Sequence, residues 1–142
     1  MANKQYEDAL QTMVNLSYDE LVERGLYSLK KVMPALNGIA KNGDGSQFLL
    51  TIIGTCVAID GKITGLEHQF INDTLGLNVS FEDMSAAFEQ FYNDKAIEVS
   101  NSIAQALSND DRVQLAIFCT CLLAVDHTIA KVENAFIQML LS

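Results

Sequence analysis

The chain reads Ala58-Ile59-Asp60-Gly61-Lys62-Ile63-Thr64-Gly65-Leu66-Glu67 over residues 58–67, and this stretch returns in diverged form 66 residues later. Seven of the 18 positions in 58–75 are identical to their counterparts in 124–141. The identical pairs are Ala58 and Ala124, Asp60 and Asp126, Ile63 and Ile129, Glu67 and Glu133, Phe70 and Phe136, Ile71 and Ile137, and Leu75 and Leu141. Self-similarity at a fixed spacing that includes the acidic positions indicates an internal duplication.

Each copy predicts a helix, a reversal and a second helix. The apolar runs 48–59 and 113–125 precede the two acidic positions, and their length and spacing favour buried helices. Asp60 or Asp126 then ends the helix, the chain turns over three residues, and Glu67 or Glu133 falls in the first turn of the next helix. Two such units are expected to pack about a pseudo-twofold axis, with the apolar helices at the centre.

The rest of the chain also shows helical spacing and helix start signals. Capping patterns begin at Ser17, Thr64, Ser80 and Ser108; Ser46 is predicted to cap the first apolar helix, and Pro34 to open a short third helix. We therefore predict an all-α, single compact domain (1–142) of about seven or eight helices. N-terminal helices occupy 1–45 and the duplicated core occupies 46–142.

An apolar stripe in the second half allows two interpretations. Phe81, Met84, Phe88 and Phe91 follow the helical rhythm, so they line one face of a predicted helix. Such a stripe either packs in the core or forms a groove for a partner. The core interpretation is favoured because apolar stripes at this spacing are more often buried.

The charge distribution restricts the classes of partner. The net charge is −9, and residues 72–142 carry 10 acids against 3 bases, whereas residues 1–71 carry 8 against 6. An acidic second half repels phosphate, which argues against nucleic acid and against docking on anionic lipid. The imbalance is compatible with a cation or with a basic protein partner.

The cysteines and the apolar runs indicate a cytoplasmic chain without a membrane-spanning segment. Cys56, Cys119 and Cys121 are odd in number and lie in apolar runs, where free cysteine packs as a small hydrophobe. Both long apolar runs are shorter than the ~20 residues that a membrane-spanning helix needs.

The repeated motif resembles the signature of the TerB-like family, named after a tellurite-resistance protein. The resemblance rests on Ala58-x-Asp60-Gly61, on Ile63 and Glu67, and on the second copy, and it covers roughly residues 46–142. It implies a compact all-helical fold and a non-enzymatic role in tellurite or general stress response, with a protein partner at the membrane.

The resemblance also implies a metal-chelating set made of Asp60, Glu67, Asp126 and Glu133. A divalent cation such as Ca²⁺ takes six to eight oxygen ligands, so the two acidic turns would have to converge. The simpler interpretation, which we favour, is local: acids at these places cap helices and oppose the helix dipole. The second copy also departs from the motif, because His127 replaces the glycine and Ala130 replaces the capping Thr64.

Two functional hypotheses from different classes follow. The first is a non-enzymatic interaction or scaffold module with no cofactor. The second is a metal-responsive sensor that uses the four carboxylates. An enzyme is disfavoured because no pattern pairs a nucleophile with a base, and His68 and His127 are isolated from other ligands of a zinc site.

Overall fold

The computed structural model describes residues 8, 10–59, 61–91 and 95–142. Within these ranges the chain is helical and contains no strand, as predicted. A short helical segment at residues 10–13 precedes seven longer helices. These are α2 (Tyr18–Ile39), α3 (Ser46–Ala58), α4 (Gly65–Leu75), α5 (Phe81–Phe91), α6 (Ala96–Gln105), α7 (Asn109–Ala124) and α8 (Lys131–Leu141).

Hydroxyl side chains begin four of the helices where the sequence predicts. Ser17, Thr64, Ser80 and Ser108 each accept a hydrogen bond from the backbone N–H three residues on, which satisfies a donor that the helix itself leaves unpaired. The prediction for Ser46 was wrong. Gly45 is the N-cap residue of α3, and the carboxylate of Asp44 accepts from the N–H of Ser46 at 3.0 Å.

The prediction that Pro34 opens a third helix was also wrong, because α2 continues through it for 22 residues in all. A proline inside a helix costs about 3 kcal/mol or more. Val32 and Leu36 lie on either side of Pro34 and are fully buried. Burying each stabilises the fold by about 1.5–3 kcal/mol, so tertiary packing is large enough to hold the helix through the proline.

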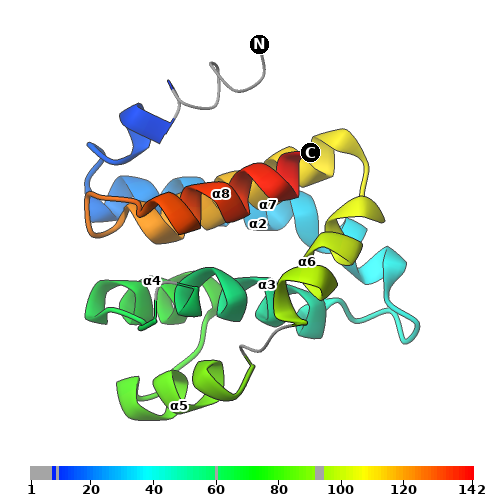
Figure 1. Ribbon diagram of the computed structural model, residues 1–142, viewed down its shortest axis with the longest axis horizontal. Helices are drawn as coiled ribbons and strands as arrows, with labels where there is room; N and C mark the ends of the chain where they lie inside the picture. The colour runs from blue at the N-terminus through cyan, green and yellow to red at the C-terminus, as the bar shows by residue number, and fades with distance from the viewer. Residues whose placement is uncertain (1–7, 9, 60, 92–94) are drawn as a thin grey trace.

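The two apolar helices are central, as the duplication predicts. Every residue from Ile52 to Val57 in α3 is buried, and so is every residue from Phe118 to Ala124 in α7. Figure 1 shows α2, α7 and α8 in one layer and α3 and α4 in the other, with α5 beneath and α6 at the side.

The packing partners repeat in the same way as the sequence. In the first copy α2 precedes α3 and α4, and in the second copy α6 precedes α7 and α8. Helix α2 packs on α7 and α4, while α6 packs on the corresponding α3 and α8. Each copy thus sends its leading helix onto the central helix of the other. Because α2 is part of this exchange, the N-terminal region shares the core of the duplicated region.

The described helices also agree with the prediction that the chain has no membrane-spanning segment. None of them combines the length and the apolar character needed to cross a bilayer.

Two glycines of α2 differ in how closely other helices approach them. A Cβ atom at Gly25 would lie 2.7 Å from Cζ of Phe70, a fully buried ring that packs against Phe118. A Cβ atom at Gly38 would meet no other atom within 4 Å. Gly25→Ala is therefore expected to lower the free energy of unfolding by about 1–3 kcal/mol through overpacking.

Gly38→Ala is the matched control, since it makes the same change in the same helix. Its free energy of unfolding should stay the same or rise by up to about 1 kcal/mol, because alanine suits a helix better than glycine. Urea unfolding followed by circular dichroism measures both. Equal effects of the two substitutions would contradict the close approach of α2 to α4.

Candidate functional site: two acidic turns and an apolar groove

The two reversals have matching backbone geometry. After α3 the N–H of Gly61 donates to the carbonyl of Ala58 at 2.9 Å, and after α7 the N–H of His127 donates to that of Ala124 at 2.8 Å. Gly61 has φ of 112° and His127 has φ of 61°. The turn therefore needs a positive φ in both copies, which glycine adopts freely and histidine only at a cost.

The two glutamates of the motif have the same structural task. Oε1 of Glu67 accepts from the N–H of Thr64 at 2.9 Å, and Oε1 of Glu133 accepts from the N–H of Ala130 at 2.8 Å. Their exposed fractions are only 3% and 4%. Each carboxylate bonds the backbone at the start of its own helix, which supports the favoured interpretation of these acids as caps.

One hydrogen bond joins the two turns directly. Oγ1 of Thr64, from the first copy, donates to Oδ2 of Asp126 in the second copy at 2.7 Å. Thr64 thus caps α4 and links the copies at the same time. The symmetric bond cannot form in the other direction, because Ala130 has no hydroxyl. Asp60, the fourth predicted acid, lies outside the described residues.

One of the buried cysteines, Cys56, lies close to both glutamates. A hydrogen bond with Cys119 and burial, together with the negative charges of Glu133 and Glu67, raise the pKa of the Cys56 thiol. Burial likewise raises the pKa of Cys121 to about 12. All three cysteines are buried and form no disulfide, so they pack as small apolar side chains, as predicted.

The predicted cation site is only partly covered by the described residues. Among these, no group of three or more histidine, cysteine or acidic side chains is arranged to hold a metal ion. Because Asp60 is not among them, the set of Asp60, Glu67, Asp126 and Glu133 stays a prediction. The bond between Thr64 and Asp126 nevertheless brings the two turns together, as such a site would require.

Both histidines make local structural contacts. His68 contacts the carbonyl of Val79 through Nε2 at 2.6 Å and packs edge-on against Phe81. His127 contacts the carbonyl of Val14 through Nδ1 at 2.8 Å. Neither contact could be predicted from residue spacing, because each joins segments that only the fold brings together.

The aromatic stripe of α5 is mainly core. Met84 and Phe88 are buried, which confirms the favoured interpretation for these two residues. Phe81 is partly exposed beside His68. The side chain of Phe91 lies outside the described residues.

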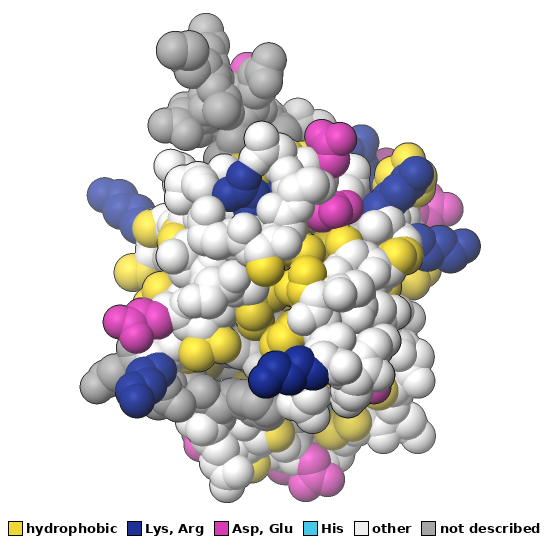
Figure 2. All heavy atoms as spheres, turned by 90° about the vertical axis from the view of Figure 1, so that its right-hand side faces the viewer, with side chains coloured by type: hydrophobic (Ala, Val, Ile, Leu, Met, Phe, Trp, Pro, Cys, Tyr) yellow, Lys and Arg dark blue, Asp and Glu magenta, His cyan; other side chains and the backbone are white. Residues whose placement is uncertain are grey.

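An apolar groove lies on a different face, and sequence reasoning missed it. It is a hollow of about 430 Å³ between the end of α2, the start of α3 and the outer side of α6. Its lining residues are Ile39, Phe48, Lys95, Glu98, Val99, Ser102, Ile103 and Ala106. Figure 2 shows apolar side chains gathered in a hollow on this side of the molecule. Three separate elements contribute to it, so no single stretch of sequence signals it.

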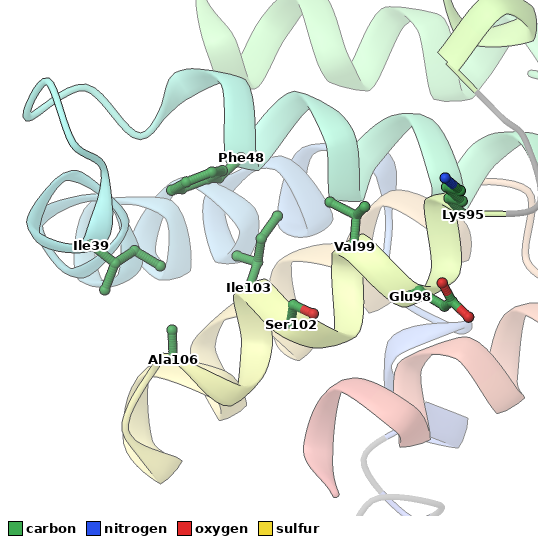
Figure 3. A pocket seen from close by; sticks show the side chains of 8 residues that line it. All are labelled: Ile39, Phe48, Lys95, Glu98, Val99, Ser102, Ile103 and Ala106. Atoms are coloured by element: carbon green, nitrogen blue, oxygen red, sulfur yellow. The ribbon is translucent and has the colours of Figure 1, made fainter.

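A charged end distinguishes this groove from a purely apolar one. Figure 3 shows Phe48, Ile103 and Ile39 around one end, and Lys95 and Glu98 at the other. Apolar side chains that line an open groove beside charged groups are typical of surfaces that bind another protein.

A scan against protein-family models, a search of curated proteins and a search of solved structures each found no match to this chain. The resemblance to the TerB-like family therefore rests on the repeated sequence motif alone.

Thr64 and Ala130 occupy equivalent positions, directly before α4 and α8, so paired substitutions there test the equivalence of the two turns. Thr64→Val removes both the cap of α4 and the link to Asp126, so the free energy of unfolding should fall by about 1–3 kcal/mol. Ala130→Thr supplies the missing hydroxyl at the equivalent helix start, where the backbone is already extended. It should raise the free energy of unfolding by about 0.5–2 kcal/mol.

Urea unfolding of both variants and the wild type measures these changes. A loss of stability in Ala130→Thr would contradict the structural equivalence of the two turns.

Proposed function

We propose that this protein is a non-enzymatic interaction module of the TerB-like type, which binds a basic amphipathic helix of a protein partner. The observation that carries the proposal is the apolar groove between α2, α3 and α6 with its charged end. An amphipathic helix fits such a groove by placing its apolar side chains inward, a common mode of peptide recognition.

The tasks of the acidic residues support binding over catalysis. Glu67 and Glu133 accept hydrogen bonds from helix starts, and Asp126 accepts one from Thr64. Carboxylates held in this way stabilise the scaffold and are poorly placed to exchange protons with a substrate. A rigid scaffold suits a binding module, because little ordering is then needed when the partner docks.

Charge favours a basic partner. The chain carries a net charge of −9, and Glu98 is exposed at the edge of the groove. A partner helix with lysine or arginine beside its apolar face would be drawn to the chain and oriented by Glu98. The Lys95 ammonium beside Glu98 would repel a second cation placed too near it, and so helps to set the register.

The resemblance to TerB extends this proposal. It places the module in the cytoplasm, in tellurite or general stress response, with a partner that is itself at the membrane. Support comes from the duplicated motif, whose turns agree in φ sign, hydrogen bonding and glutamate capping.

A designed peptide pair tests the groove. A fluorescent amphipathic helix of leucine and lysine is expected to bind the protein, whereas the same helix with glutamate in place of lysine is not. Val99→Lys puts a charge into the groove and should weaken binding of the basic peptide at least tenfold, about 1.4 kcal/mol. Fluorescence anisotropy measures the Kd.

Val132→Lys is the matched control, because Val132 is similarly exposed but lies on α8, outside the groove. It should leave the Kd unchanged. Binding that is equally weakened by both substitutions, or no binding of the basic peptide, would rule out this groove as the site.

A metal-responsive sensor is the second candidate, and one observation favours it. The bond between Thr64 and Asp126 brings the two acidic turns into contact. If Ca²⁺ binds there, millimolar calcium chloride should raise the Tm of the wild type, because a ligand that binds only the folded state stabilises it. The rise should vanish in Asp60→Asn/Glu67→Gln and in Asp126→Asn. An unchanged Tm of the wild type with calcium and with zinc would exclude this candidate.

A further inference from the structure

A second surface, which we call the α2–α7 face, lies where these two helices run side by side. Tyr27 on α2 has an exposed fraction of 60%, the highest among the large apolar side chains of the described residues. Val113 on α7 is exposed to 43%. Exposed aromatic and branched side chains on adjacent helices are typical of the centre of a protein interface.

Two hollows run along this seam. One, of about 360 Å³, is lined by Glu23, Arg24, Tyr27, Ser28, Gln114 and Ile117. The other, of about 370 Å³, is lined by Tyr27, Lys31, Asp110, Asp111, Val113 and Gln114. Tyr27 and Gln114 line both, so the two hollows are adjacent, with these two side chains between them. Rising numbers on α2 meet falling numbers on α7, so the helices are antiparallel.

The two edges of this face carry opposite charge. The α2 edge has Arg24 and Lys31, with Glu23 as its only acid, and the α7 edge has Asp110 and Asp111. The charges of the residues that line the two hollows thus sum to about −1, although the net charge of the whole chain is −9. Charges beyond about 8 Å are largely screened at physiological salt, so the local balance decides what this face can meet.

We propose that the α2–α7 face binds a second copy of this chain as a symmetric dimer. In this dimer the twofold axis lies between the two facing surfaces and runs parallel to α2 and α7. The α2 edge of one copy then lies over the α7 edge of the other. Lys31 then faces Asp110 and Asp111 of the other copy, and the same contact occurs twice. Tyr27 lies over Val113 of the other copy, near the centre of the contact.

The alternative twofold axis, across the helices, fits less well. It would place Lys31 over Arg24 of the other copy, and like charges in contact are costly. The arrangement parallel to the helices sets Lys31 against two acids and Tyr27 against Val113, whereas the other sets Lys31 against Arg24 as well as Glu23. The cation–π contact of Lys31 with the Tyr27 ring, at 5.4 Å from its centroid, holds the ammonium beside the apolar centre of the face. The dimer leaves the groove between α2, α3 and α6 open, because the two lining sets share no residue.

A charge-swap experiment tests this dimer by sedimentation velocity at about 100 µM protein, since an interface of small size holds only in the micromolar range. The wild type is expected to sediment as a dimer at physiological salt, where the repulsion between two chains of net charge −9 is largely screened, and to dissociate at about 1 M salt, where the contacts between Lys31 and Asp110 are screened as well. Lys31→Glu and Asp110→Lys should each be monomeric on their own, because each creates a repulsive contact twice. Mixed in equal amounts they should dimerise again, since the mixed pair has one native and one reversed contact.

Two further variants separate a lost interface from a lost fold. Tyr27→Ser should be monomeric and keep the wild-type circular dichroism spectrum, because the side chain is exposed. Lys62→Glu makes the same charge change as Lys31→Glu at an exposed position outside the face, and should stay dimeric. A monomeric wild type overturns the proposal, as does a dimer that survives both Lys31→Glu and Tyr27→Ser.

Discussion

The structure depends on how each buried central helix is allowed to stop. Helices α3 and α7 are so apolar that their ends lie close to the core, where backbone N–H and C=O groups need partners. A residue with positive φ turns the chain, and a glutamate in the next helix then accepts from the N–H of the residue that precedes that helix. Both copies do this with a buried glutamate, since Glu67 and Glu133 are only 3% and 4% exposed. Both copies of the duplicated unit therefore satisfy the polar groups of buried helix ends in the same way.

This constraint also explains the structural role of the acidic residues in the two turns. A carboxylate near a turn is open to several interpretations until its partners are known. Here Glu67 and Glu133 accept from backbone donors, and Asp126 accepts from a hydroxyl of the other copy. The last bond exists in one direction only, because alanine stands at 130 where threonine stands at 64. The copies have thus diverged in chemistry while keeping their shape, which makes a symmetric role for the two turns hard to maintain.

Both proposed binding surfaces arise from helices that exchange between the copies. Because α6 packs on α3 of the other copy, its outer side forms a groove with Phe48 and Ile39. Because α2 packs on α7, Tyr27 is brought beside Val113, and basic residues of one helix are brought beside acids of the other. The first surface is apolar with one base and one acid at its end, whereas the second has mostly bases on one edge and acids on the other, so that it can pair with a copy of itself.

The amino-acid pattern by itself determined the helical class, four of the helix starts and the central place of both apolar runs. Those features depend on interactions within a few residues and on helical periodicity, which a single sequence displays. The path of α2 through Pro34, the bond from Thr64 to Asp126 and both surfaces were decided by tertiary structure alone. Each of them joins residues far apart in the chain, or sets a local cost against burial that exists only once the helices have packed.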